Sequence, residues 1–388
     1  MKKLVIFLVL FSALPCVYSQ AAFYNAGNIQ MHGTAQVGFH TNVINDGVFN
    51  NNSGSAGFYS QDQSIVVSGK NKMIFKDITV EVFDDLFLST SIGVTNDLLL
   101  NIGRVNTPTN DKAVSLDFID SRIYVGADDD RHVDGYVTVT NSGEFTFPIG
   151  NAGLLRPMIL PNSPRTGTFK GAYFKLDPNT PNTSATPTTF TTSFDTNAKD
   201  LTLTSVNTEE FWDLDGSDVT SIKLTWDKNS NLGALTQKVS DLRVVGWSKD
   251  LEFWVDLGNT GVGGDMNNGT IQSTPFIPDE FEVITIGSGK AAENIVFGNY
   301  GISPNGDGTN DTFAIKNIEI SHNNTLRIYN RWSLLVYSKN DYDNSWGGFS
   351  DNKLNVNREL GLPDGTYFYV LDFHDLGISW QGWVYVKR

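Results

Sequence analysis

Short runs of alternating apolar and polar residues, separated by turn-forming residues, constrain the fold of this chain more than any other feature. In the last hundred or so residues they include Leu326–Trp332, Leu335–Tyr337 and Gly382–Val386. Because successive side chains of a strand point to opposite faces, such alternation is typical of strands with one buried face. Proline, glycine, asparagine and aspartate break the runs and indicate tight turns. The stretch is therefore predicted to be a small, immunoglobulin-like antiparallel β-sandwich.

A second region with this alternation lies between Phe190 and Gly287. Runs such as Ile222–Trp226 and Phe281–Ile286 are separated by turns and show no helical periodicity. The pattern predicts a second β-sandwich over residues 161–289. Its tryptophans are expected to fill the core, because a large ring buries much area on a half-covered sheet. These residues are Trp212, Trp226, Trp247 and Trp254. A platform for stacking carbohydrate is the alternative role for these rings.

Residues 20–160 are rich in asparagine, glycine and β-branched residues and contain no tryptophan. An Asn-x-Gly step before a short apolar run recurs at Asn25–Gly27, Asn45–Gly47 and Asn101–Gly103, about 20 residues apart at first. Such a repeat is typical of stacked rungs in a β-solenoid. An ordinary β-sandwich is the alternative, because the period is irregular. Between Val133 and Pro157 the pattern changes, and a cap or boundary is expected there.

The first 19 residues have the organisation of a secretory signal peptide. Lys2 and Lys3 precede an apolar run, Leu4–Phe11, that is too short to span a bilayer. Cys16 is the only cysteine and lies within this segment. The exported chain would therefore hold no disulfide and no cysteine metal site, and it is expected to be stabilised by burial alone.

The chain is acidic, with 43 aspartates and glutamates against 28 lysines and arginines. Loss of Lys2 and Lys3 with the signal peptide would take the formal net charge from −15 to −17. Such a surface repels nucleic acid and anionic lipid headgroups. No later apolar run approaches the ~18 residues of a membrane-spanning helix. These properties exclude nucleic acid as a partner and favour an extracellular protein.

Sequence motifs for catalysis are lacking. The chain has no His-Glu-x-x-His, no Gly-x-Ser-x-Gly, no phosphate-binding loop and no Gly-x-Gly-x-x-Gly that opens a helix. The histidines are scattered without ligand spacing: His32, His40, His132, His322 and His374. A metal pair formed by His32 and His40 on adjacent strands is the alternative. The sequence predicts that the protein is not an enzyme and that catalytic residues and a bound cofactor are absent.

The polar stretch Ser303–Phe313 is the one place where a cation is considered. Asn305, Asp307, Asn310 and Asp311 cluster oxygen ligands around glycines, as calcium loops do. The spacing does not fit an EF-hand loop, and no bidentate glutamate follows at the required position. The favoured interpretation is a tight turn, in which Asn-Gly and Asp-Gly supply positive φ while Asn310 and Asp311 cap the following backbone.

Five motifs follow one another across residues 292–388. They are Pro304–Phe313, Ile328–Trp332, Tyr342–Gly348, Leu362–Tyr369 and Gly382–Arg388. Their order resembles the gliding-motility-associated C-terminal domain, the type B sorting domain of the type 9 secretion system of Bacteroidota. Two positions depart from that pattern. Ser333 stands where a glycine is usual, and Gly347 stands where aspartate or asparagine is usual, both in turns.

The resemblance implies that this domain is read by the type 9 translocon with its shuttle protein. It also implies that an outer-membrane partner barrel of the PorP/SprF kind holds the cargo at the cell surface. The implied sorting and partner-binding residues are Pro304, Asn305, Gly306, Asp307, Gly308, Asn310, Asp311, Asn330, Arg331, Trp332, Trp346, Gly365, Tyr367, Gly382, Trp383, Val384, Lys387 and Arg388. Two of them have structural alternatives. Trp332 is a candidate core residue, and Arg331 is a candidate partner for a carboxylate near Asp341 or Asp343.

The sequence therefore predicts an all-β, multidomain secreted protein that passes through the periplasm to the cell surface. Its domains are a signal peptide at 1–19, the repeat-like region at 20–160, a β-sandwich at 161–289 and the sorting domain at 292–388. The passenger is predicted to be a non-catalytic adhesin or gliding-motility module. The alternatives are an extracellular glycan-binding protein or glycoside hydrolase with the same sorting domain, and a periplasmic protein without onward transport.

Overall fold

The protein is built almost wholly from β-strands. The computed structural model describes residues 22–120, 123–140, 143–161, 167–200, 202–289, 300–318, 321, 323–351, 361–374 and 378–388. Strands account for 49% and helices for 4%, so the predicted all-β class is confirmed. The chain divides into two compact units, Met1–Tyr136 and Val137–Arg388. The predicted signal peptide at 1–19 and His322 lie outside the described residues. Among the residues that are described, no helix is long and apolar enough to cross a membrane.

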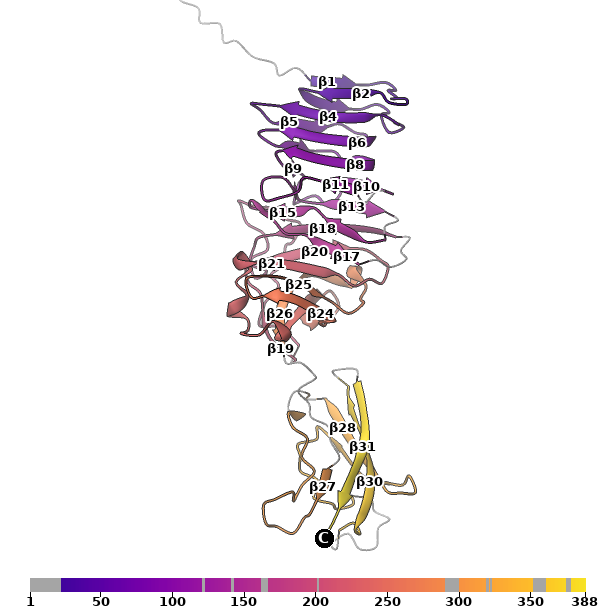
Figure 1. Ribbon diagram of the computed structural model, residues 1–388, viewed down its shortest axis with the longest axis vertical. Helices are drawn as coiled ribbons and strands as arrows, with labels where there is room; N and C mark the ends of the chain where they lie inside the picture. Colours follow the sequence, from indigo (N-terminus) through magenta and orange to yellow (C-terminus); the bar gives the residue numbers. More distant parts are fainter. Residues whose placement is uncertain are drawn as a thin grey trace, which may run out of the picture. The chain divides into compact units, whose positions relative to one another are not determined.

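The first unit is a parallel β-solenoid, in which the chain contributes strands alternately to two sheets (Figure 1). The first sheet has the spatial order β1 (Ala22–Asn25), β3 (Asn42–Asn45), β5 (Ile65–Ser68), β7 (Leu86–Leu88), β9 (Val105–Asn106) and β12 (Val133–Asp134). The second has the order β2 (Gln36–Phe39), β4 (Ser55–Ser60), β6 (Met73–Val82), β8 (Ile92–Ile102) and β10 (Leu116–Ile119), and β11 (Ile123–Val125) also pairs with β8. Neighbouring strands run parallel in both sheets. The solenoid prediction is thus confirmed over the sandwich alternative for this region.

Equivalent residues of successive rungs stack on one another. Phe39 and Phe58 lie on neighbouring strands, with their ring centroids 5.3 Å apart and their planes at 25°. At one corner Asn25 donates from Nδ2 to Oδ1 of Asn45 at 2.7 Å, and Asn45 donates to the carbonyl of Asn71 at 2.8 Å. Both asparagines are buried, so these bonds satisfy polar groups that water does not reach. This is the physical basis of the early Asn-x-Gly repeat.

Strand pairing changes from parallel to antiparallel in the second unit, within the segment where the sequence predicted a boundary. One sheet has the order β13 (Val137–Thr140), β18 (Thr168–Phe174), β20 (Phe211–Asp215), β26 (Phe281–Gly289), β22 (Leu242–Ser248) and β23 (Trp254–Asp256), with β19 (Leu203–Val206) also on β26. The other has the order β14 (Phe145–Phe147), β17 (Met158–Leu160), β21 (Lys223–Asp227), β25 (Asn268–Gln272) and β24 (Gly261–Asp265). The remaining elements are the hairpin strands β15 (Ile149–Asn151) and β16 (Leu154–Leu155) and the 3-10 helices η1 (Lys228–Ser230), η2 (Leu232–Ala234), η3 (Val239–Asp241) and η4 (Pro278–Glu280). The two larger sheets face each other, because a side chain at Gly171 on β18 would collide with Met158 on β17.

The tryptophans of this region belong to its core, as predicted. Trp212, Trp226 and Trp254 are buried, and the half-buried Trp247 packs edge-on against Trp254 with the ring centroids 5.7 Å apart. The indole nitrogen of Trp226 donates to the carbonyl of Asp265 at 2.8 Å. The alternative of a carbohydrate-stacking platform does not hold for Trp212, Trp226 and Trp254, because these rings are buried in the protein interior.

The C-terminal domain is a single five-stranded sheet with loops packed on one face. Its spatial order is β27 (Tyr300–Ile302), β31 (Ile378–Val386), β30 (Gly365–Phe373), β28 (Asn324–Tyr329) and β29 (Leu335–Asn340). The first two strands run parallel and the others antiparallel. Phe313, Tyr342 and Trp346 come from the connecting segments and cover the inner face. Among the described residues of this domain there is no second sheet of the kind that an immunoglobulin-like sandwich requires. The connecting segments take that place as the second layer.

Candidate functional site

The turn between β28 and β29 presents an arginine and a tryptophan to solvent. The side-chain oxygen of Asn330 accepts hydrogen bonds from the amides of Trp332 and Leu334, both at 3.0 Å, and so closes the turn. Trp332 is 71% exposed. The Arg331 guanidinium lies over its indole ring, 4.1 Å from the centroid, which is a favourable cation–π arrangement. The pair forms an apolar surface with a positive charge at the tip of the turn.

A groove of about 550 Å³ separates this turn from the segment that leads into β30. Residues Asn330–Trp332 and Leu334 line one side, and the stretch Leu362–Phe368 lines the other. Three of the sequence motifs contribute to it or anchor it, although they lie far apart along the chain. Pockets that combine apolar walls with a few charged groups are typical binding sites.

The terminal arginine fixes one wall of the groove. The backbone amide of Arg388 donates to Oδ1 of Asp364 at 2.9 Å. Its guanidinium donates to the carbonyls of Leu362 and Gly348 at 3.1 and 3.0 Å and lies 4.7 Å from the ring centroid of Phe349. Arg388 is therefore a positioning residue that holds Leu362–Asp364 in place.

Exposed aromatic residues continue from the groove across the outer face of the sheet. Tyr329, Phe368 and Trp383 lie side by side in register on β28, β30 and β31. Phe368 is 51% exposed and Trp383 is 40% exposed. Exposed apolar surface of this kind commonly marks a protein–protein contact. We call the groove and these three aromatic residues the C-terminal surface.

The Ser303–Phe313 stretch is a turn held by side chains. Both carboxylate oxygens of Asp311 accept backbone amides, at 3.0 Å from Asn305, 2.8 Å from Gly306 and 2.7 Å from Gly308. These bonds lower the pKa of the Asp311 carboxyl. Gly306, Gly308 and Asn310 have positive φ, as predicted for the glycines. Asp311 caps the preceding backbone rather than the following one, which corrects the sequence-based expectation. No group of three or more metal-ligating side chains was found among the described residues.

The residues predicted for sorting divide into surface and core. Arg331, Trp332, Trp383 and Lys387 are exposed, as are most residues of the turn, Asn305, Gly306, Asp307, Gly308 and Asn310. Three others are buried and hold the domain together: Trp346, Tyr367 and Val384. Gly382 lies against the ring of Tyr369, where a side chain would collide with the ring, and Gly365 and Pro304 lie at or near strand ends.

Two structural alternatives are wrong. Trp332 is not a core residue, because the Asn330 cap turns it outward. Arg331 does not pair with Asp341 or Asp343 among the described contacts. Asp343 forms an ion pair with Lys339, whose Nζ lies 2.6 Å from Oδ1 of Asp343. The Arg331 guanidinium stacks on Trp332 instead.

Phe368 and Pro363 line the groove but were not among the predicted site residues. The signal for Phe368 was present, because it is the outward residue between the inward Tyr367 and Tyr369.

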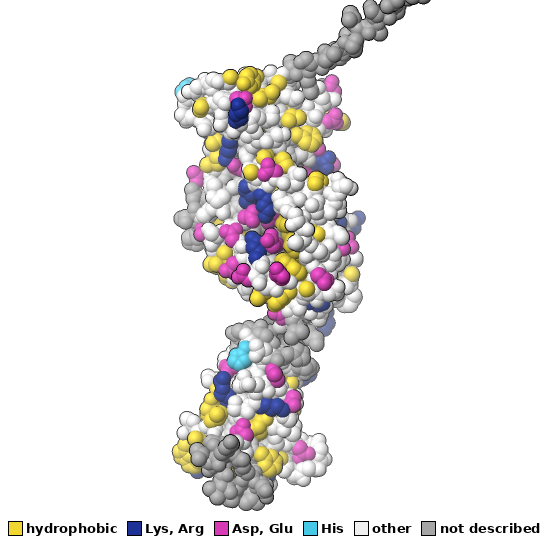
Figure 2. All heavy atoms as spheres, turned by 180° about the vertical axis from the view of Figure 1, so that it is seen from behind, with side chains coloured by type: hydrophobic (Ala, Val, Ile, Leu, Met, Phe, Trp, Pro, Cys, Tyr) yellow, Lys and Arg dark blue, Asp and Glu magenta, His cyan; other side chains and the backbone are white. Residues whose placement is uncertain are grey.

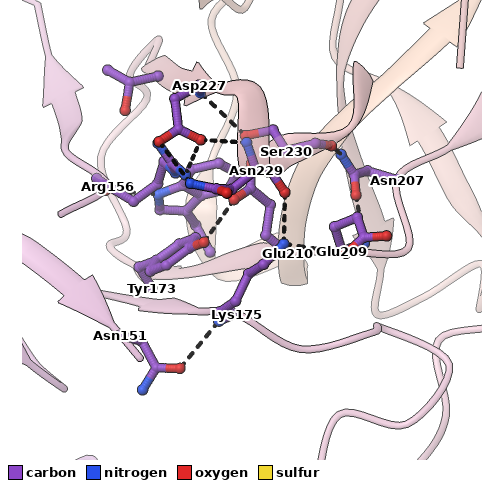
Figure 3. A network of polar contacts seen from close by, with 12 residues as sticks. Asn151, Arg156, Tyr173, Lys175, Asn207, Glu209, Glu210, Asp227, Asn229 and Ser230 are labelled. Carbon is purple, nitrogen blue, oxygen red and sulfur yellow. Dashed lines mark hydrogen bonds and ion pairs between the residues drawn. The ribbon is translucent and has the colours of Figure 1, made fainter. Parts of the chain in front are cut away.

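The most buried cluster of charges lies in the second unit, and sequence reasoning missed it. Figure 3 shows Arg156 between Glu210 and Asp227. Its Nε lies 3.2 Å from Oε2 of Glu210, and its Nη2 lies 2.8 Å from Oδ1 of Asp227. The Tyr173 hydroxyl donates to Glu210 at 2.6 Å, and burial raises the pKa of this tyrosine well above its usual value. Lys175 pairs with Glu209 at 3.2 Å. The Arg156 guanidinium thus bridges the carboxylates of Glu210 and Asp227.

The fold and the site define the class of the C-terminal part: a small β-sheet domain with a groove and exposed aromatic residues on its surface. Residues 295–386 match the family described as the CHU_C Type IX secretion signal domain. The predicted resemblance is thereby confirmed, and this is the sorting domain of the chain. It supports secretion by the type 9 system, contact with the type 9 secretion machinery and export to the cell surface or the extracellular space. No curated protein matches the chain, and no solved structure does.

Proposed function

We propose that the type 9 machinery recognises this chain through the C-terminal surface, and that the two preceding regions are a non-catalytic attachment module carried to the cell surface. The observation that carries the first part is the convergence of separate motifs on one groove, with Arg331 and Trp332 exposed at its rim. A translocon and its shuttle protein, followed by an outer-membrane barrel of the PorP/SprF kind, are the proposed partners.

The chemistry of the C-terminal surface favours a partner with apolar and acidic or carbonyl groups. A guanidinium stacked on an indole can still donate hydrogen bonds at its edge, and such arginine–aromatic pairs are frequent in the centres of protein interfaces. The exposed backbone of an edge strand offers a further mode, in which a partner strand adds to the sheet.

The attachment role rests on different observations. The solenoid presents a long parallel sheet as a scaffold, and in the second unit Arg156 forms ion pairs with the carboxylates of Glu210 and Asp227. On the face drawn in Figure 2, lysines and arginines lie among acidic side chains. These features favour adhesion or gliding over hydrolysis or nucleic-acid binding.

The double substitution Arg331→Ala/Trp332→Ala tests the recognition surface. Full-length protein is expressed in a host with an active type 9 system, and the surface fraction is measured by whole-cell immunodetection. We expect the surface fraction to fall at least tenfold with an unchanged melting temperature, because both side chains are exposed and contribute little to folding. The matched control is Lys316→Ala, an exposed basic residue outside the groove. Normal export of the double variant would overturn the proposed surface.

A further inference from the structure

A second groove, of about 540 Å³, lies in the solenoid at the end where the strands of its second sheet finish. The side chains that give it its chemistry are His40, Tyr59, Gln61, Glu81, Phe83 and Ile102. They lie at or just after the ends of β2, β4, β6 and β8, so successive rungs contribute to the groove. None of these residues belongs to the sorting domain.

The lining residues form a row that crosses the strands. Tyr59 pairs in register with Glu81, and Glu81 pairs in register with Ile102. The His40 ring lies beside the Tyr59 ring, with centroids 5.5 Å apart and planes at 27°. Adjacent strands are about 4.8 Å apart, so the row places one side chain at each such step.

A glycine at position 57 allows the tyrosine to lie flat on the sheet. A side chain at Gly57 would come within 2.2 Å of the Tyr59 ring, whereas one at Gly38 would make only an ordinary contact with it at 3.5 Å. Because one face of the ring rests on this bare backbone, the opposite face points away from the sheet. The result is an aromatic platform bordered by Phe83, which is 66% exposed.

The charge of the groove restricts its ligand. Glu81 supplies a carboxylate and Gln61 an amide, whereas no lysine or arginine stands among the described residues that line the groove. Anionic chains such as nucleic acids and uronates would be repelled by this carboxylate and by the acidic chain as a whole. An uncharged ligand with many hydroxyl groups fits, because hydroxyls donate to carboxylates and to amide carbonyls.

We propose that this groove binds an extended, uncharged, β-linked polysaccharide that crosses the strands with one sugar ring at each rung. The strand step is close to the length of one pyranose ring along such a chain. The apolar C–H face of a sugar stacks on Tyr59, and its equatorial hydroxyls reach Glu81 and Gln61. The inference rests on the proposed attachment role and deepens it, since it names the class of surface to which the passenger binds.

Isothermal titration of the purified full-length chain tests the proposal, with cellohexaose and N-acetylchitohexaose as probes. We expect at least one to bind, and Tyr59→Ala to weaken that binding at least tenfold. Gly57→Ala is expected to weaken it similarly, because its methyl group displaces the Tyr59 ring. Tyr24→Ala, at an exposed tyrosine of the other sheet, is the matched control and should leave affinity unchanged.

Three results would overturn the proposal: neither probe binds the wild-type chain, Tyr59→Ala binds as tightly as wild type, or oligogalacturonate binds as well as the neutral probes. Attachment is measured separately, as adhesion of cells with and without the protein to polysaccharide-coated surfaces. Adhesion without binding of the probes would refute the groove alone. Adhesion that does not depend on the protein would refute the attachment role.

Discussion

Ser333 adopts a backbone conformation that glycine adopts at lower cost. Its φ is +59°, and its amide donates to the Asn330 carbonyl at 2.9 Å to complete the turn. The left-handed region costs a residue with a Cβ about 1 kcal/mol. The sequence departs from the family pattern at this position, and the turn nevertheless keeps the geometry that favours glycine.

Ser333→Gly is therefore expected to stabilise the C-terminal domain by about 0.5 kcal/mol, after allowance for the greater freedom of glycine in the unfolded chain. For a domain of this size the melting temperature should rise by roughly 2–4 °C. Differential scanning calorimetry measures the change. Ser338→Gly, in the extended backbone of β29, is the control and should destabilise. Equal effects of the two substitutions would contradict the assignment of strain to Ser333.

The stability of the turn around Asp311 should depend on pH. Backbone amides of Gly306, Gly308 and Asn305 hold the pKa of this carboxyl below its ordinary value of 3.8. A lowered folded-state pKa means that the stabilisation is complete above the unfolded value and is lost as pH falls through the folded one. The amide resonances of Gly306 and Gly308 should therefore shift with a midpoint below 3.8. Asp311→Asn should remove the titration, and a midpoint at or above the ordinary value would contradict the account.

The stability of the second unit depends on a buried ion cluster that joins several of its elements. Arg156 comes from the segment between β16 and β17, Glu210 directly precedes β20, and Asp227 ends β21. The cluster thus links strands of both sheets. Removing one member of a buried ion pair leaves an uncompensated charge, which is costlier than losing an exposed pair.

Neighbouring glutamates provide a matched comparison. Glu210→Ala is expected to lower the free energy of unfolding by about 3 kcal/mol, because Arg156 stays buried without its deeper partner. Glu209→Ala removes a partly exposed pair with Lys175 and should cost less than about 1 kcal/mol. Urea unfolding followed by tryptophan fluorescence reports on both, since Trp212 lies beside the cluster. Similar losses for the two variants would show that the cluster is not the main support.

The sequence predicted which segments form strands better than it predicted which sheet each strand joins. Asn25 and Asn45 were correctly recognised as one repeat, because their spacing matches one solenoid turn. Asn101–Gly103 resembles them in sequence but lies at the end of β8, which belongs to the other sheet. There Gly103 lies against the Val82 carbonyl. A short polar triplet does not specify which corner of a rung it occupies.

The candidate site was predictable where local chemistry decides and not where tertiary packing decides. The positive φ of the glycines in the Ser303–Phe313 turn could be predicted from the sequence. Trp332 was open to either assignment, because its exposure depends on the Asn330 cap. The Arg156 cluster joins residues more than fifty positions apart in the sequence, so no local pattern could reveal it.

In the molecule as a whole, the regions that form the scaffold are distinct from the domain that carries the sorting signal. The solenoid and the antiparallel sandwich both bury many apolar side chains, and the C-terminal domain has a core cluster of its own. A sorting domain with an independent core can direct transport without taking part in what the passenger binds. Residues 295–386 match the secretion signal family and are expected to direct the export of this chain.

Expression of full-length protein and of a version that ends at Gly289, in a host with an active type 9 system, tests this claim most directly. Both are assayed in the periplasm, at the cell surface and in the medium. We expect the full-length protein to reach the surface or medium while the truncated protein accumulates, folded, in the periplasm. Arrival of both proteins at the same place would contradict it, and the C-terminal domain would then be one more structural domain rather than an export signal.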